Sequence, residues 1–388
     1  MKLKKVVALV AVGAVATNLV ACSSSSGGSA TTAAAETTAA AAETKAAETT
    51  AAAAKDGEAK GIKVGFTNSY NGNSYRQTEE KQMQIVADKL KADGYISEYT
   101  VAEANQDTAT QIAQIEDFIT QGYDIIIVDP ASTSSLNNAI MEACDAGIPV
   151  INVDSGVNES HCVTTVYSDN KQNGRACGLS YAEFMGDKEI YSIMLSGEKG
   201  NVAGNERRQG LICGILEQRL GISEEEAWKM TEEADATLLS TGSYTNEEAK
   251  FTIAGQGWGN WTIAEGLVAA EDLITANPDV NLVMGENDPM LIGALTALDN
   301  AGITYGTDGT VKLISAADGS KTGYDYIKEG KIMAIGENSP AKIAELGMKI
   351  AQEILVDGAD PESYDDITMT QAAAVTVDNV DEHYEYGF

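Results

Sequence analysis

Residues 68–76, which read NSYNGNSYR, gather amides, hydroxyls, aromatic rings and an arginine into one short segment. The segment follows an apolar run, residues 62–66, that is typical of a β-strand. Amides and hydroxyls both donate and accept hydrogen bonds, arginine donates only, and the tyrosines add flat apolar faces. These groups could together bind a small polar molecule, but asparagine and serine also favour ordinary turns. Both interpretations stay open on this segment alone.

Two later segments place an aspartate at the end of a strand-like run. The run IPVINVD ends at Asp154, and the run VKLISAAD ends at Asp318. Each belongs to a longer unit with the same order of strand, Asp-Pro, helix, Ala-Gly-Ile, strand and aspartate, so the chain contains two similar α/β units. Ligands of parallel sheets bind outside the carboxyl ends of the strands. Two such units that face each other would therefore form a cleft lined by both aspartates.

Catalytic motifs give little support to an enzymatic function. Asp154 and Asp318 could serve a glycosidase as paired carboxylates, but the sequence does not indicate that either is desolvated as an acid. The sequence has no P-loop, no G-x-S-x-G motif and no zinc-binding pattern, and its segment GQGWGN lacks the dinucleotide-binding spacing. A binding protein needs the same carboxylates as hydrogen-bond acceptors. We therefore expect binding rather than catalysis, with no cofactor and no metal.

The segments that must position these side chains alternate between strand and helix patterns through most of the chain. An amphipathic helix is predicted by apolar residues at positions i, i+3, i+4 and i+7, namely Met83, Val86, Ala87 and Leu90. Residues 124–128, DIIIV, form a largely apolar run of the kind found in strands that are buried on both faces of a parallel sheet. This alternation predicts a doubly wound α/β fold.

The first residues have the pattern of a targeting segment. A basic start, residues 1–5, precedes a small, apolar stretch over residues 6–20 that is too short and too rich in alanine for a convincing membrane span. The stretch ends in LVAC, which resembles the bacterial lipobox, and this resemblance implies that Cys22 receives lipid. We expect a signal peptide over residues 1–21 and a low-complexity tether over residues 22–60. The protein would then work outside the cytoplasm, attached to the membrane by its acyl chains.

Composition limits the partners of the chain. A net charge of −32 over 388 residues excludes nucleic acid, because phosphate backbones require lysine and arginine patches. Cys144, Cys162, Cys177 and Cys213 remain beyond the lipobox, and their spacing shows no metal or redox pattern. We expect buried free thiols, although the compartment also permits disulfides.

Four segments give the chain a resemblance to a known family. The segments AGIPVINVD, YSDNKQNGRACG, GENDPMLIGALTAL and AADGS lie in the order and spacing of the type I periplasmic sugar-binding proteins. This is the ribose- and galactose-binding group, which delivers substrates to ABC importers. The resemblance extends from Ile62 to about Val380.

The resemblance implies two doubly wound, parallel-sheet lobes that are joined by a three-segment hinge and close around a ligand. The N-terminal lobe would comprise residues 62–167 and 339–367. The C-terminal lobe would comprise residues 168–338 and 368–388.

The resemblance also implies a set of ligand-binding residues. They match the family's polar first loop, its strand-end acids, its arginine, its aromatic and its amides: Asn68, Asn73, Tyr75, Arg76, Asp154, Arg207, Trp261, Asn287, Asp318 and Asn338. Carboxylates and amides suit vicinal hydroxyls, the guanidinium fork spans two neighbouring oxygens, and aromatic rings cover the C–H faces of a sugar. A small ligand with hydroxyls on all sides would thus use the whole opening segment.

This sequence departs from the ribose-binding pattern at three positions. Ser155 follows the first aspartate, where ribose binders commonly have arginine, and Asn338 replaces a common glutamine. Arg76 lies in the opening loop instead, as in some relatives that take hexoses or furanoses. The resemblance therefore implies a monosaccharide, with pentose, hexose and furanose forms open.

The function expected from the sequence is capture of a small sugar by a monomeric, lipid-anchored extracellular receptor. The receptor would deliver the sugar to an ABC permease in the membrane and would perform no chemistry. Two alternatives belong to other classes: a ligand sensor that feeds a membrane signalling kinase, and, with less support, a surface glycosidase.

Overall fold

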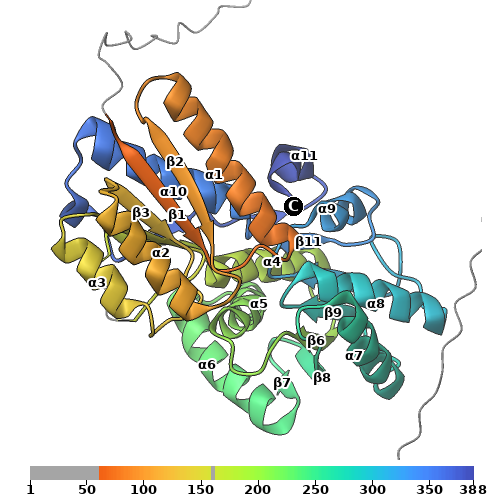
Figure 1. Ribbon diagram of the computed structural model, residues 1–388. Helices are drawn as coiled ribbons and strands as arrows, with labels where there is room; N and C mark the ends of the chain where they lie inside the picture. The colour runs from red at the N-terminus through yellow and green to blue at the C-terminus, as the bar shows by residue number, and fades with distance from the viewer. Residues whose placement is uncertain (1–60, 159–161) are drawn as a thin grey trace, which may run out of the picture. The chain divides into compact units, whose positions relative to one another are not determined.

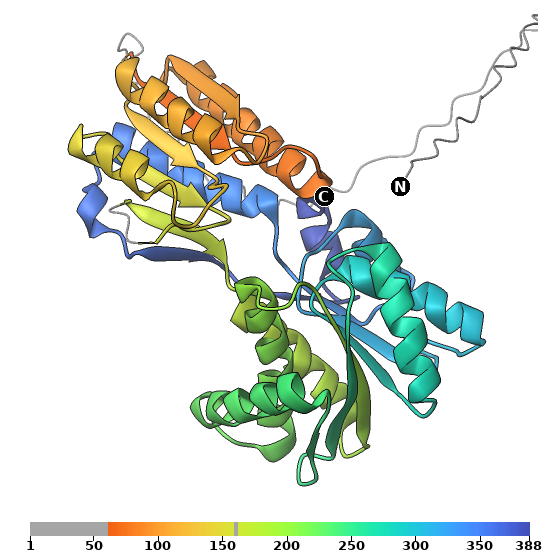
Figure 2. The same cartoon turned by 60° about the horizontal axis from the view of Figure 1, so that its bottom comes forward.

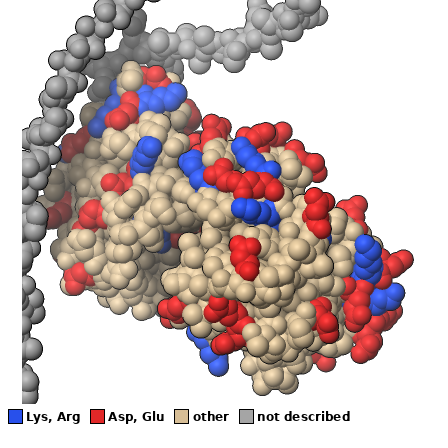
Figure 3. All heavy atoms as spheres, turned by 90° about the vertical axis from the view of Figure 1, so that its right-hand side faces the viewer, with Lys and Arg blue, Asp and Glu red and all other residues tan. Residues whose placement is uncertain are grey.

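The computed structural model describes residues 61–158 and 162–388 (Figure 1). The predicted signal peptide, Cys22 and the tether lie outside the described residues. No helix in the described part is both long and apolar enough to cross a membrane. Figure 3 shows acidic side chains scattered over the face that it presents, with fewer basic ones among them, in keeping with the net charge of −32.

The N-terminal lobe is built on a sheet whose strand order is β12-β5-β4-β3-β1-β2 and whose pairings are all parallel. Its strands are β1 (Lys63–Asn68), β2 (Glu98–Glu103), β3 (Ile125–Val128), β4 (Val150–Val153), β5 (Thr164–Ser168) and β12 (Ile367–Thr370). Every residue of β3 and β4 is buried, as the continuous apolar run predicts for a central parallel strand.

Helices cover both faces of this sheet. They are α1 (Ser74–Ala92), α2 (Thr108–Thr120), α3 (Asn137–Asp145) and α10 (Pro340–Gln352). The predicted apolar face of α1 is confirmed, because Met83, Ala87 and Leu90 are buried. They share a core cluster with Ile343 of α10, whereas Ile115 of α2 packs in a cluster with α3. The sheet is therefore doubly wound.

The C-terminal lobe is built on a second sheet, of order β13-β11-β10-β9-β6-β8-β7, in which only the two edge strands of the described chain pair antiparallel. Its strands are β6 (Ile190–Ser196), β7 (Tyr244–Asn246), β8 (Phe251–Trp258), β9 (Leu282–Gly285), β10 (Lys312–Ser315), β11 (Ala334–Gly336) and β13 (Ala374–Val375). Its helices are α4 (Asn170–Met185), α5 (Val202–Leu220), α6 (Glu224–Thr241), α7 (Ile263–Ala276), α8 (Asp288–Ala301), α9 (Lys321–Lys328) and α11 (Val380–His383).

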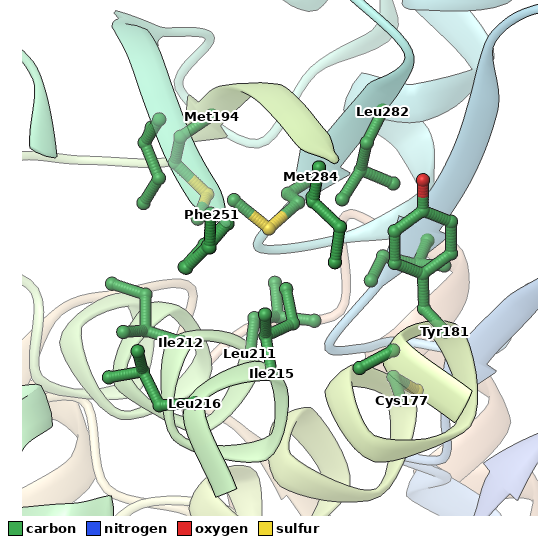
Figure 4. Packing of buried hydrophobic residues seen from close by; sticks show 14 of the residues in the cluster. Cys177, Tyr181, Met194, Leu211, Ile212, Ile215, Leu216, Phe251, Leu282 and Met284 are labelled. Carbon is green, nitrogen blue, oxygen red and sulfur yellow. The ribbon is translucent and has the colours of Figure 1, made fainter. Parts of the chain in front are cut away.

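One core cluster of this lobe fixes the position of α5, which carries a predicted site residue. Side chains of α4 and α5, such as Cys177 and Leu211, face Met284 and its neighbours on the strands (Figure 4). The two helices approach each other at glycines, since a Cβ atom on Gly174 would lie only 2.6 Å from the carbonyl oxygen of Arg207. Close contact of the two backbones thus sets the start of α5.

Three crossings of the described chain join the lobes, and they are tied together by hydrogen bonds (Figure 2). The carbonyl oxygen of Glu337, in the second crossing, accepts from Ser168 Oγ (3.0 Å) and from Asn173 Nδ2 (2.7 Å). Asn173 Oδ1 accepts from the backbone N–H of Ala373 (2.9 Å), in the third crossing. One side chain at the start of α4 therefore holds two of the crossings.

The predicted lobe boundary near residue 367 is wrong by one short strand. Residues 367–370 form β12, which pairs with β5 in the N-terminal sheet, so the third crossing follows Thr370. The strands on either side of this crossing, β12 and β13, lie only a few residues apart in the sequence, and the segment between them has no glycine or proline to mark the crossing.

Two of the cysteines match the expectation of buried thiols. Cys177 and Cys213 are free and buried, and burial raises the pKa of the Cys213 thiol to about 12. Cys144 and Cys162 are only half-buried. Burial also raises the pKa of the Cys144 thiol, to about 11.

Candidate ligand-binding site

A first charged cluster lies at the carboxyl ends of β3 and β4, where the guanidinium of Arg76 reaches over from the start of α1. Arg76 Nη2 is 2.8 Å from Asp154 Oδ2, and Arg76 Nη1 is 3.1 Å from both Asp129 Oδ2 and Glu79 Oε2. The structure thus brings the predicted Arg76 and Asp154 together. It adds two acids, Asp129 and Glu79, that are absent from the predicted set.

This first cluster holds three carboxyl groups for one guanidinium. Burial raises the pKa of Glu79 well above its usual value and that of Asp129 to about 6, although Arg76 opposes both shifts. Burial would lower the pKa of Arg76, but the neighbouring carboxylates raise it instead. Glu79 Oε1 and Asp129 Oδ1 are buried and have no hydrogen-bond partner among the described residues. These two oxygens are therefore unsatisfied polar atoms enclosed within the cluster.

Tyr75 connects this cluster to the second crossing between the lobes. Its hydroxyl oxygen lies 2.6 Å from Asp154 Oδ1 and 3.1 Å from Asn338 Oδ1. Burial and the adjacent Asp154 raise the pKa of Tyr75 well above its usual value, so the hydroxyl stays protonated and can donate. Asn338 Nδ2 in turn lies 3.4 Å from Asp318 Oδ1. A chain of polar contacts thus runs from Asp154 to Asp318.

A second charged cluster lies at the carboxyl ends of β9 and β10 in the C-terminal lobe. Arg207 Nη1 is 3.0 Å from Asp318 Oδ1, and Arg207 Nε donates to Asn170 Oδ1 (2.9 Å). The guanidinium carbon of Arg207 lies 5.5 Å from the ring centroid of Trp261. Asn287 Nδ2 donates to the carbonyl oxygen of Trp261 (3.2 Å) and lies 3.5 Å from Asp318 Oδ2. Asn338 joins this cluster through Asp318. The structure therefore brings together all five residues predicted for this lobe: Arg207, Trp261, Asn287, Asp318 and Asn338.

The ring of Trp261 packs closely against two glycines. A Cβ atom on Gly197 would be 2.2 Å from the ring, and one on Gly204 would be 2.9 Å from it. Only glycine therefore leaves room for the ring at these two positions. Trp261 itself has a positive φ of 65°, a backbone conformation that is unusual for a bulky residue.

Asp288 supports the loop that carries Asp318. It is fully buried, and its carboxylate accepts from the backbone N–H groups of Asp318 (3.3 Å) and Ser320 (3.1 Å) and from the Ser320 hydroxyl. Burial and the nearby Asp318 raise the pKa of Asp288 to about 6. Asp288 and Asp129 both precede a proline at a strand end, so the repeated Asp-Pro pair is the sequence signal for these acids.

Two predicted residues lie in neither cluster. Asn68 is buried, and its Nδ2 points to Glu103 Oε1 (3.3 Å) and Glu80 Oε2 (3.4 Å). Asn73 is exposed and caps α1, accepting from the backbone N–H of Arg76 (2.8 Å). Ser69 takes the place expected for Asn68, since its hydroxyl donates to Asp129 Oδ2 (2.5 Å). Successive side chains of an extended segment point to opposite sides, so Ser69 contacts the cluster and Asn68 points away from it.

The raised pKa of Asp129 predicts an unusual dependence of apo stability on pH. Its folded pKa of about 6 exceeds the ordinary aspartate value of about 3.9, so its contribution to stability is complete below pH ~4 and is lost as pH rises through ~6. In the Asp129→Asn variant this position does not titrate, so it adds no pH dependence to the stability of the variant. We expect the Tm of the ligand-free wild type to rise relative to that of the variant when the pH falls from 7.5 to 5, by an amount equivalent to about 1–1.5 kcal/mol. Melting curves of both proteins across this range check the prediction, and parallel pH profiles would contradict it.

Among the described residues, no group of three or more histidine, cysteine, aspartate and glutamate side chains is arranged to hold a metal ion. The acids of both clusters are instead engaged by arginine and by hydroxyl, amide or backbone N–H groups. The arrangement suits a ligand that both donates and accepts hydrogen bonds.

Comparison with known proteins agrees with this geometry. A family model described as a periplasmic binding protein domain matches residues 64–360. The ribose import binding protein RbsB of Bacillus subtilis is 27% identical over 255 residues, which are 66% of this chain and 70% of that protein. The galactofuranose-binding protein YtfQ of Escherichia coli is 24% identical over 327 residues, which are 84% of this chain and 91% of that protein.

Solved structures show the same fold. A periplasmic ribose ABC transporter protein from Conexibacter woesei matches with a TM-score of 0.65 at 18% identity, covering 85% of this chain and 97% of that one. A solute-binding protein from Actinobacillus succinogenes, solved with bound D-allose, matches with a TM-score of 0.63 at 22% identity, covering 83% and 99%. These likenesses confirm the predicted fold of two doubly wound lobes with a three-segment hinge. The family match over most of the chain, taken with the relatives named for ribose and galactofuranose, shows that this protein belongs to the periplasmic binding proteins, in the type I sugar-binding group.

Proposed function

We propose that this protein is a lipid-anchored, extracellular substrate-binding protein that captures a small neutral sugar between its lobes and delivers it to an ABC importer. One observation carries the proposal. An arginine–aspartate pair lies at the strand ends of each lobe, Arg76–Asp154 in one and Arg207–Asp318 in the other. The hydroxyl of Tyr75 and the amide of Asn338 connect the two pairs.

The two pairs supply complementary hydrogen-bonding groups to a polyhydroxylated ligand. Each carboxylate can accept a hydrogen bond from a sugar hydroxyl, and each guanidinium can donate to one or two neighbouring hydroxyl oxygens. A ligand that contacts both pairs stabilises the closed arrangement of the lobes, because it binds that state more tightly than the open one. The closed form is then what the importer would recognise.

Relatives of this chain support a neutral polyhydroxylated ligand. They are named for ribose, for ribose and allose, for galactofuranose and for xylitol. The excess of carboxylates over guanidinium groups in the first cluster also disfavours an anionic sugar acid or sugar phosphate, because like charges repel in a desolvated site.

Two other functions receive less support. A surface glycosidase needs a carboxylic acid that reaches the glycosidic oxygen, whereas the acids with raised pKa in the two clusters, Glu79, Asp129 and Asp288, are all fully buried. A sensor for a membrane kinase would use the same sugar site. Sugar-dependent binding of this protein to a permease would support transport, whereas sugar-dependent binding to a kinase ectodomain would support sensing.

The experiment that tests sugar binding is a thermal-shift screen of the full chain. The panel contains neutral pentoses, hexoses, furanose-forming sugars and polyols, with uronic acids, sugar phosphates and amino acids as controls. We expect at least one neutral sugar or polyol to raise the Tm by several degrees, since a ligand that binds only the folded state stabilises it. A shift produced only by a control class would overturn the proposal.

The lipid anchor is tested by the Cys22→Ala variant. We expect incorporation of a radioactive fatty acid to fall to background, because the variant lacks the thiol to which the lipid would be joined. The variant should be released into the medium or stay as the unprocessed precursor. Ser23→Ala serves as the control and should keep the label. Equal labelling of wild type and Cys22→Ala would rule out the anchor.

A further inference from the structure

The C-terminal segment, residues 380–388, lies beside the candidate site. It consists of α11 and a short 3-10 turn, Tyr384–Tyr386, followed by Gly387 and Phe388. Figures 1 and 2 both place the C mark next to the start of α1, the helix that carries Tyr75 and Arg76. None of the four segments that carry the family resemblance includes these residues.

The segment is fixed to the loop that carries Asp318. The backbone N–H of Lys321 donates to the Phe388 carbonyl oxygen (3.0 Å), and Lys321 Nζ donates to the Gly387 carbonyl oxygen (2.7 Å). Gly387 is buried, and a Cβ atom there would lie 3.2 Å from the carbonyl oxygen of Gly319. The segment therefore packs directly against the residue that follows Asp318.

The segment is also fixed to the second crossing, next to Asn338. Ser339 Oγ donates to the Tyr386 carbonyl oxygen (2.9 Å). His383 Nδ1 lies 2.8 Å from Glu337 Oε1, and Glu337 is buried. Residues on both sides of Asn338 thus hold the segment in place.

From this fixed position the segment reaches the other lobe. The ring of Phe388 meets the ring of Tyr75 edge to face, with centroids 5.2 Å apart and planes at 78°. This is a favourable geometry for an aromatic pair. Phe388 as a whole is half-buried.

We propose that Phe388 is a positioning residue for Tyr75 and sets the size limit of the ligand at this edge of the site. Its ring restricts the rotation of Tyr75, so that the tyrosine hydroxyl stays on Asp154 and Asn338. Its exposed part occupies space that a larger substituent on the sugar would need. The inference rests on the proposed sugar-binding function, because it concerns the same site.

Ligand-free spectra test the positioning directly. In protein with labelled tyrosine rings, Phe388→Ala should shift and broaden the Tyr75 ring resonances, because the ring current and the steric restraint are both lost. Phe388→Tyr, which keeps the aromatic edge, should leave them nearly unchanged. Phe184→Ala is the matched control, since Phe184 is 49% exposed on α4 and its recorded aromatic contact is with Tyr181. Unmoved Tyr75 resonances in Phe388→Ala would overturn the proposal without any ligand.

Affinity measurements test the size limit. We expect Phe388→Ala to bind the best sugar of the screen about three- to tenfold more weakly, as loss of one aromatic pair implies. The same variant should lose less affinity, or gain affinity, for the methyl glycoside of that sugar, so that the ratio of the two Kd values changes. On a Tyr75→Phe background the loss should be much smaller, because the hydroxyl to be positioned is absent.

The outcomes separate this inference from the proposed function. A wild type that binds no sugar rejects the proposed function, and the tyrosine spectra still decide the positioning of Tyr75. A uniform loss of affinity for both ligands, with a lower Tm of the ligand-free protein and no rescue by Phe388→Tyr, would mean that Phe388 is only structural. That result would overturn the inference while leaving sugar binding intact.

Discussion

Replacing Asp154 with asparagine should weaken sugar binding by about 2–5 kcal/mol, the usual range for removing one charged partner from a desolvated polar contact. Asp154 accepts from Arg76 Nη2 (2.8 Å) and from the Tyr75 hydroxyl (2.6 Å), so it orients both groups. An amide cannot serve both donors equally well, and its N–H groups would face the guanidinium. Titration calorimetry with the sugar found in the screen measures the loss.

The choice of asparagine follows from the backbone at this position. Asp154 has a positive φ of 56°, which asparagine tolerates and alanine does not tolerate as well. Asp154→Ala would therefore mix a lost contact with added strain. Asp124→Asn is the matched control, because Asp124 accepts from the backbone N–H of Lys63 (2.7 Å) at the opposite end of the sheet. Unchanged affinity of folded Asp154→Asn would remove Asp154 from the site.

The sequence is informative about the fold because its apolar patterns reflect burial directly. The run over residues 125–128 is buried at every position, and Met83, Ala87 and Leu90 form the buried face of α1. The location of the strand-end aspartates can also be predicted from the sequence, since the carboxyl ends of parallel strands meet at one edge of a sheet. Asp154 and Asp318 both lie at such ends and both pair with an arginine.

Residues of the first cluster that depend on tertiary packing could not be predicted. Glu79 lies one turn after Arg76 on α1, where a glutamate normally faces solvent, yet its side chain is fully buried against the guanidinium. Periodicity places Glu79 on the same face as Met83, but it does not indicate that a charged residue there is buried against an arginine. Asp129 carried a signal in its Asp-Pro pair, but only the fold shows that it shares Arg76 with Asp154.

Other differences arise from short elements. The two residues Asn68 and Ser69 are both polar, and which of them meets Asp129 depends on the direction of each side chain at the strand end. The contribution of residues 380–388 could not be predicted either. Its contacts with Lys321 and Ser339 use backbone carbonyl oxygens, which every residue type provides.

Replacing Trp261 with alanine should remove most of the ligand-induced stabilisation while leaving the ligand-free protein nearly as stable. The ring is only partly buried, with one face on Gly197 and Gly204 and with the Arg207 guanidinium 5.5 Å from its centroid. Under the proposed function, the rest of the ring would cover the apolar face of a bound sugar. We expect a loss of binding free energy of about 2–3 kcal/mol, the value of one well-buried aromatic side chain. Melting with and without the sugar measures both effects.

Two further variants make this last prediction specific. Trp261→Phe should retain part of the ligand-induced shift, because a smaller aromatic face remains and Asn287 still donates to the backbone carbonyl of residue 261. Trp228→Ala is the matched control, since Trp228 lies on α6, where its Nε1 donates to Glu224 (3.1 Å), and should keep the full shift. A core tryptophan would instead cost about 3–5 kcal/mol of stability with or without sugar. If Trp261→Ala melts far lower without ligand and yet keeps the full shift, the ring supports the C-terminal lobe and does not touch the sugar.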